Sequence, residues 1–72
     1  MKKRSISIAG HRTSIALEDE FWILVQKISV EMDLSIPKLL ELIENQKKSD
    51  NLASAIRLYV LDYLIKKQKI VG

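Results

Sequence analysis

The chain has 72 residues, no cysteine, one histidine and a net charge of +3, with 47% hydrophobic and 29% charged residues. This composition is typical of one small globular domain and excludes a disordered tail, a multidomain enzyme and a disulfide framework. A single core in a chain below roughly 70–80 residues rarely supplies more than about 3–5 kcal/mol, so we expect association with a second copy of the chain.

Catalytic and metal-binding chemistry finds little support in the sequence. Without cysteine there is no thiolate zinc site, and His11 alone cannot form a histidine cluster, so no metal or other cofactor is implied. No acid precedes Glu18 to orient the imidazole, and strand alternation puts Ser14 on the face opposite His11. We therefore expect no enzymatic activity.

Uncharged runs in the sequence are short. The longest, residues 5–11, has seven residues and is half polar, whereas a membrane-spanning helix needs about 18 apolar residues. We expect no targeting peptide, no membrane segment and a cytoplasmic location.

Charge is distributed unevenly along the chain. Residues 1–17 contain four basic residues and no acid, residues 18–51 contain four lysines and eight acids, and residues 52–72 contain four basic residues and one acid. An acid-free basic segment is typical of a phosphate-binding surface, although a solvated tail is the alternative interpretation.

Alternating apolar residues at the N-terminus predict strand structure. Ile6 and Ile8 share one parity, and beyond Ala9-Gly10 the parity switches to Thr13, Ile15 and Leu17. Gly10 lies between the two runs, where a turn, bulge or kink would let both present an apolar face to one core. We interpret residues 1–11 as a basic arm or extra strand and residues 12–17 as the main strand.

Three helices are predicted beyond the strand, at residues 18–33, 35–47 and 51–68, and the whole chain forms one domain. The first begins with three acids, the second with a Ser35 cap and Pro37 in the first turn, and the third with Asp50 or Asn51 as its cap. Apolar residues at three- and four-residue spacing form the buried stripes of the first two helices. These are Phe21, Leu24, Val25, Ile28 and Met32 in the first, and Ile36, Leu39, Leu40 and Ile43 in the second.

The third helix is apolar over most of its circumference. One face carries Leu52, Ile56, Tyr59, Val60, Tyr63 and Leu64, and Ala55, Leu58, Leu61 and Ile65 widen it. Such a helix is buried on two sides, and a second protomer is the simplest cover for the second side. The alternative is an internal core helix with a few exposed leucines.

A single short strand leaves its backbone donors unpaired and needs a partner. If two copies pair antiparallel through residues 12–17, Thr13, Ile15 and Leu17 face the helices, and Arg12, Ser14 and Ala16 face outward. A two-stranded ribbon of this kind fits the major groove of DNA.

The run RTSIALEDEFW, followed by a capped second helix, resembles the ribbon-helix-helix family of DNA-binding proteins from Arg12 to about Lys47. The longer run KRSISIAGHRTSIALEDEFW with NLASAIRLYVLDYL resembles a bacterial subgroup with an extra strand segment and a third helix. The resemblance implies a mainly α fold with one short β-strand per chain. Strands from two subunits would form an antiparallel two-stranded ribbon over a helical dimer core.

The resemblance also implies a function, that of a homodimeric transcriptional regulator, or repressor, which binds double-stranded DNA sequence-specifically with the ribbon in the major groove. The expected base contacts are Arg12, Ser14 and Ala16. Arg12 could instead contact the DNA backbone or pair with Glu18. The expected phosphate contacts are Lys2, Lys3, Arg4, Ser35, Ile36 and Lys38. Residues 51–54 also resemble the start of the family's second helix, so the phosphate could bind there instead.

The expected dimer core contains Ile15, Leu17, Phe21, Tyr59, Val60 and Tyr63. A different class of function stays open as the alternative. In this alternative the chain is a protein-interaction module, such as an antitoxin-like or phage-encoded adaptor, which binds a partner protein with the surface of the third helix.

Overall fold

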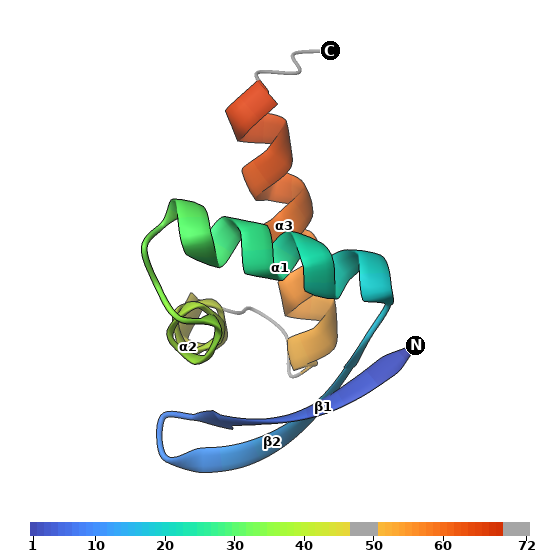
Figure 1. The fold of residues 1–72 in the computed structure, drawn as a ribbon, viewed down its shortest axis with the longest axis vertical. Coiled ribbons are helices and arrows are strands. Elements are labelled where there is room, and N and C mark those ends of the chain that lie inside the picture. The colour runs from blue at the N-terminus through green and yellow to red at the C-terminus, as the bar shows by residue number, and fades with distance from the viewer. Residues whose placement is uncertain (47–50, 69–72) are drawn as a thin grey trace.

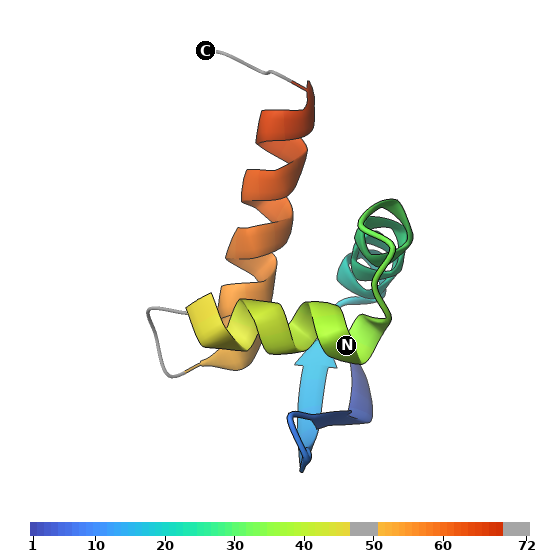
Figure 2. The ribbon, with the colours of Figure 1, turned by 90° about the vertical axis from the view of Figure 1, so that its left-hand side faces the viewer.

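A β-hairpin and three helices follow one another in the computed structural model, which describes residues 1–46 and 51–68. Their bounds are Lys2–Ile8 for β1, His11–Leu17 for β2, Asp19–Glu31 for α1, Ile36–Gln46 for α2 and Leu52–Gln68 for α3. The hairpin lies at one end of the molecule and α1 crosses α3 (Figure 1). Turned by 90°, the same structure shows α2 running across the base of α3, above the hairpin (Figure 2).

A two-residue turn at Ala9 and Gly10 joins the strands. Both residues have positive φ, 51° and 84°, which is the combination that the tight type I′ turn requires. In the resulting register Ile8 lies opposite His11 next to the turn, and Lys2 lies opposite Leu17 at the far end of the hairpin. The mainly helical ribbon-helix-helix class is confirmed. Of the two interpretations of residues 1–11, the structure has the extra strand and not the basic arm, so each chain contains two strands where the resemblance implied one.

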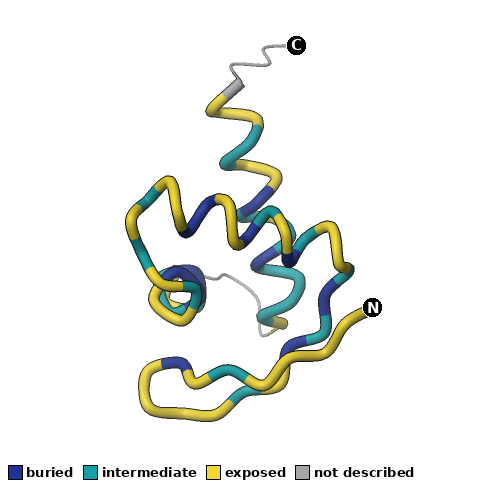
Figure 3. The backbone as a smooth tube through the Cα atoms, in the orientation of Figure 1, coloured by how far each residue is buried: buried dark blue, intermediate teal, exposed yellow. Residues whose placement is uncertain are grey.

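The core lies between the hairpin and the helices, on the inner sides of all five elements (Figure 3). Its buried side chains are Ile8, Ile15 and Leu17 from the hairpin, Trp22, Val25 and Ile28 from α1, Leu39, Leu40 and Ile43 from α2, and Ile56 and Val60 from α3. The predicted stripe of α2 is confirmed, apart from Ile36, which is only partly buried.

The predicted stripe of α1 is confirmed at Val25 and Ile28, whereas Phe21, Leu24 and Met32 are only partly buried, and the buried residue that the prediction omitted is Trp22. Trp22 is 4% exposed, whereas Phe21 is only partly buried at the margin of the core. The Trp22 indole N–H donates a hydrogen bond to the Lys2 carbonyl at 3.0 Å, so the ring is buried without leaving its polar group unpaired.

The ends of α1 lie inside the predicted range of residues 18–33. Glu18 occupies the N-cap position, but its side chain makes no cap hydrogen bond. At the other end Asp33 adopts a positive φ of 57°, and the Leu34 N–H donates to the Ser29 carbonyl at 2.8 Å. This left-handed residue ends the helix and turns the chain toward α2.

The other two helices begin with the predicted caps. The Lys38 N–H donates to Ser35 Oγ at 3.3 Å, and the Ser54 N–H donates to Asn51 Oδ1 at 3.2 Å. The predicted end of the second helix at Lys47, and Asp50 as an alternative cap, fall outside the described residues. No helix within the described ranges is long and apolar enough to cross a membrane.

Candidate nucleic-acid interface

The outer face of the hairpin is polar, basic and free of acids. Residues directly across an antiparallel pair share a face, and the register pairs Lys3 with Ala16, Ser5 with Ser14 and Ser7 with Arg12. All six therefore lie on one side of the hairpin, which we call the outer face, and all but Ala16 are exposed. The predicted parity of β2 is confirmed, since Ile15 and Leu17 on the other side are 3% and 0% exposed.

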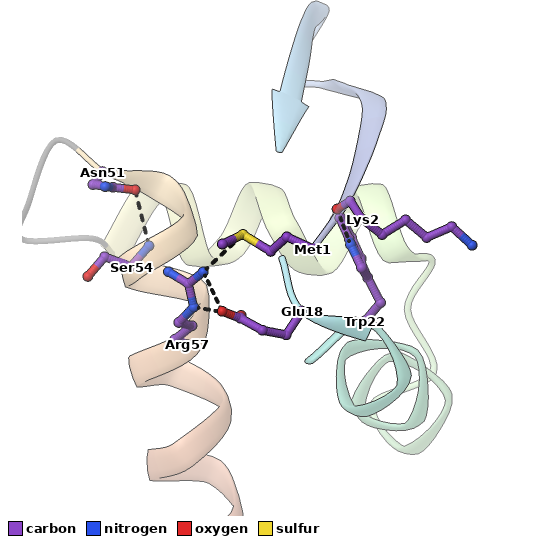
Figure 4. Close-up of polar contacts among 7 residues, drawn as sticks. All are labelled: Met1, Lys2, Glu18, Trp22, Asn51, Ser54 and Arg57. Atoms are coloured by element: carbon purple, nitrogen blue, oxygen red, sulfur yellow. Dashed lines mark hydrogen bonds and ion pairs between the residues drawn. The ribbon is translucent and has the colours of Figure 1, made fainter. Parts of the chain in front are cut away.

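Lys2 and Arg4 lie on the side of β1 that faces the helices. The Arg4 guanidinium carbon is 5.0 Å from the Trp22 ring centroid, a cation–π contact. The Lys2 carbonyl accepts the hydrogen bond from the Trp22 indole (Figure 4). Both contacts tie β1 to α1. Among the three basic residues at the N-terminus, Lys3 is therefore the one on the outer face.

The starts of α2 and α3 flank the hairpin on opposite edges. A shallow open hollow of about 400 Å³ separates β1 from the start of α2 and is lined by Arg4, Ser5, Ile6, Ile36 and Pro37. A second, of about 450 Å³, separates β2 from the start of α3 and is lined by Ser14, Ile15, Ala16, Asn51, Leu52 and Ala53. The two helix starts considered for phosphate binding thus lie beside different strands.

A bidentate ion pair fixes α3 against the junction of β2 and α1. Arg57 Nε and its terminal guanidinium nitrogen donate to the two Glu18 carboxylate oxygens at 3.0 and 3.2 Å (Figure 4). The hydrogen bond from Arg57 holds the pKa of Glu18 below its ordinary value of 4.5. The alternative in which Arg12 pairs with Glu18 is wrong, because Arg57 holds both carboxylate oxygens.

Sequence reasoning missed Arg57. One signal could have found it, because Arg57 is the only charged residue between residues 51 and 61, in the most apolar part of the third helix. A lone cation in such a position needs an anionic partner. Its long-range partner, Glu18, lies 39 positions earlier in the chain.

A second polar cluster joins the end of α1 to α3. The Tyr63 hydroxyl donates to Glu31 Oε1 at 2.7 Å, and Lys67 Nζ forms an ion pair with Glu31 Oε2. The hydrogen bonds from Lys67 and Tyr63 lower the pKa of Glu31, and the hydrogen bond to Glu31 raises the pKa of Tyr63. The cluster explains why Tyr63 is only partly buried despite its place on the apolar face of α3.

Exposed apolar side chains gather on α3 and α1. On α3 they are Leu58, Leu61 and Ile65, with 65%, 47% and 50% of their surface exposed, and on α1 they are Ile23 and Val30. Of the six residues expected in a dimer core, Ile15, Leu17 and Val60 are buried within one chain, and Phe21, Tyr59 and Tyr63 are partly buried. Among the described residues, the large apolar side chains that are most exposed are therefore others, and Phe21, Tyr59 and Tyr63 leave part of their surface for a partner.

The described residues contain no group of three or more His, Cys, Asp or Glu side chains that could hold a metal ion. His11 is exposed at the end of the hairpin, next to the turn.

The chain belongs to the ribbon-helix-helix domain family, whose model matches residues 1–64. Members of this family generally bind DNA as transcriptional regulators, typically dimerise and are typically not enzymes. No curated protein and no solved structure matches the chain.

Proposed function

We propose that the chain is a small cytoplasmic transcriptional regulator that binds double-stranded DNA sequence-specifically as a homodimer. The observation that carries the proposal is the acid-free outer face of the hairpin, which exposes Arg12, Ser14 and Lys3. Such a face suits the negatively charged major groove, and the membership in the family supports it.

In this proposal the free edge of β2 pairs with β2 of a second copy. In a two-residue hairpin the residues flanking the turn form a hydrogen-bonded pair, so the backbone groups of Arg12, Ser14 and Ala16 point away from β1. The free edge of β1 is a poorer self-partner, since three consecutive basic residues at positions 2–4 put charge on this edge strand, which disfavours the addition of another strand.

The distribution of exposed apolar residues favours the same edge. Contacts with the hairpin put α3 beside β2 and α2 beside β1. Among the described residues α3 exposes Leu58, Leu61 and Ile65, whereas α2 exposes no large hydrophobic side chain. A second copy that adds to β2 can therefore also cover apolar surface of α3.

Base readout is assigned to the outward side chains of β2. Arg12 can present two parallel donors to O6 and N7 of a guanine, and Ser14 can donate to or accept from a base edge. The Ala16 methyl group can make an apolar contact with a thymine methyl.

Phosphate binding is assigned to the start of α2, with the positive charges of Lys2, Lys3, Arg4 and Lys38 adding general attraction. Pro37 has no N–H and the Lys38 N–H donates to the Ser35 Oγ, so the Ile36 N–H is the first-turn donor that we assign to the phosphate. The start of α3 is less suited, because it lies beside β2, on the side where the second copy would bind.

Selection of duplexes from a random DNA pool at fixed salt tests the proposal, together with sedimentation of the free and bound protein. We expect one preferred and roughly palindromic site, bound by a dimer. Equal affinity for all duplexes, or a folded monomer bound to DNA, would contradict it.

A protein-interaction module is the second candidate function, favoured by the exposed apolar stripe Leu58, Leu61 and Ile65. This candidate predicts that no duplex is selected, that the strands serve only for dimerisation, and that a different protein covers the stripe.

A further inference from the structure

In the function proposed so far, the outer face of β1 contributes only the general attraction of Lys3, and none of its side chains has a direct contact with DNA. It presents the exposed side chains of Lys3, Ser5 and Ser7, and the register puts them level with Ala16, Ser14 and Arg12 on β2. The opposite side of the same strand carries Lys2 and Arg4 toward the helices. Alternation along β1 thus separates the three basic residues onto two faces.

The width of the sheet decides what the outer face of β1 can meet. This step rests on the proposed pairing of β2 with β2 of a second copy, which places one β1 strand on each outer side. Neighbouring strands lie about 4.8 Å apart, so the two β1 strands would be about 14 Å from each other. The major groove is about 12 Å wide and accepts a two-stranded ribbon. The β1 strands therefore lie over the walls of the groove, which are the sugar-phosphate backbones.

We propose that the outer face of β1 is a binding site for the DNA backbone. Lys3 supplies a positive charge to a phosphate, and the hydroxyl groups of Ser5 and Ser7 donate hydrogen bonds to phosphate oxygens. The central β2 strands contact the bases, and the flanking β1 strands bind the backbone on both sides of the groove and so fix the orientation of the sheet.

Two further features agree with this assignment. The contacts of Trp22 with Arg4 and with the Lys2 carbonyl hold β1 against α1, so the outer face is presented by a fixed strand rather than by a loose arm. The hollow between β1 and α2 places the start of α2 at the same outer edge, where the proposed phosphate contact of Ile36 lies.

Neighbouring lysines provide the first test, because Lys2 and Lys3 lie on opposite faces of one strand. The affinity of the full chain for its selected duplex is measured over a range of salt concentrations for the wild type, Lys3→Gln and Lys2→Gln. Each phosphate contact contributes about 0.9 to the slope of log affinity against log salt, so Lys3→Gln should lower the slope of the dimer by about 1.8. Lys2→Gln removes a charge on the opposite face that adds only general attraction, so it should lower the slope by less than Lys3→Gln does.

The double variant Ser5→Ala/Ser7→Ala tests the hydroxyl groups, with ethylation interference on the same duplex as the readout. We expect the variant to lose interference at phosphates on both groove walls and to retain the preferred sequence. Equal slopes for the two lysine variants, or an unchanged interference pattern for the serine variant, would overturn the role of β1.

The outcomes separate this inference from the proposed function. A wild-type chain that selects a duplex, with variants that behave like the wild type, overturns the role of β1 and leaves the DNA-binding function in place. A wild-type chain that selects no duplex overturns both.

Discussion

Arg12 is exposed on the outer face of β2, level with Ser7 on β1, and its proposed role is to read a base. Replacing Arg12 by alanine should cost about 1–3 kcal/mol of binding free energy on the preferred duplex. On random duplexes the loss should be smaller, because there Arg12 contributes only one positive charge. Titration of both duplexes at one salt concentration measures the difference.

The matched variant Arg12→Lys keeps the charge but loses the two parallel donors of the guanidinium. It should retain the binding to random duplexes and lose affinity for the preferred one. If alanine and lysine both cause the same loss on the two duplexes, Arg12 contacts a phosphate and does not read sequence.

Ala9 occupies a position in the hairpin turn that favours a different residue. Its φ of 51° lies in the left-handed region, which costs an L-residue other than glycine, asparagine or aspartate about 1–2 kcal/mol. Replacing Ala9 by asparagine should raise the free energy of unfolding by about 1 kcal/mol, since Asn-Gly is the preferred sequence of this turn. Denaturant titration measures the change.

The control for the turn is Gly10→Ala. A Cβ at Gly10 would meet no atom within 4 Å, so a loss of stability would come from its φ of 84° alone. A stabilising Gly10→Ala, or a destabilising Ala9→Asn, would contradict the turn geometry.

At the scale of elements, two polar contacts join α3 to α1, one near each end of α1. Glu18 pairs with Arg57 near the start of α1, and Glu31 binds Tyr63 and Lys67 at its end. Val60 is buried between these two contacts, and Ile56 is buried directly before Arg57. The two carboxylates therefore fix the orientation at which α3 crosses α1, while burial of apolar surface supplies most of the stability.

The two carboxylates predict how stability depends on acid. The pKa values of Glu18 and Glu31 are lowered in the folded chain from their ordinary value of 4.5. Both ionised carboxylates therefore stabilise the fold at pH values above about 4.5. This stabilisation is lost as the pH falls through the lowered values. The free energy of unfolding should thus decrease on acidification below about pH 4.5, and Glu31→Gln should make that decrease shallower.

Glu20→Gln is the control, because Glu20 is an exposed carboxylate on the same helix and has no ion pair among the described residues. Chemical denaturation at several pH values compares the three proteins. An acid dependence that is the same for Glu31→Gln and the wild type would contradict the role of the cluster.

At the scale of the whole molecule, α3 extends beyond the other elements with its C-terminal half (Figure 1), and the helix exposes Leu58, Leu61 and Ile65. If a second copy covers this surface, the unfolding midpoint should rise with protein concentration. The double variant Leu58→Glu/Leu61→Glu should keep its helical content and raise the Kd of the dimer by at least about tenfold. This magnitude follows because burial of one leucine contributes about 1.5–3 kcal/mol.

Asn45→Glu adds a charge at an exposed position of α2 and should leave the dimer intact. Sedimentation equilibrium of the three proteins gives the dissociation constants. A wild-type chain that sediments as a folded monomer at micromolar concentration would contradict the dimer.

The sequence by itself determined the features that depend on neighbouring residues. Strand alternation separated Arg12 and Ser14 from Ile15 and Leu17, and the caps at Ser35 and Asn51 marked two helix starts. These predictions succeed because side-chain direction along a strand and hydrogen bonding in a first helical turn are local properties of the backbone.

Only the tertiary structure decided the features that join distant parts of the chain. Ser5 and Ser7 became part of the outer face when β1 paired with β2, and the indole hydrogen bond to Lys2 accounts for the burial of Trp22, which the predicted stripe had omitted in favour of Phe21. The pair of Arg57 with Glu18 likewise joins residues 39 positions apart. Such contacts depend on how the elements pack, and a residue pattern along one helix or strand does not specify which distant group will face it.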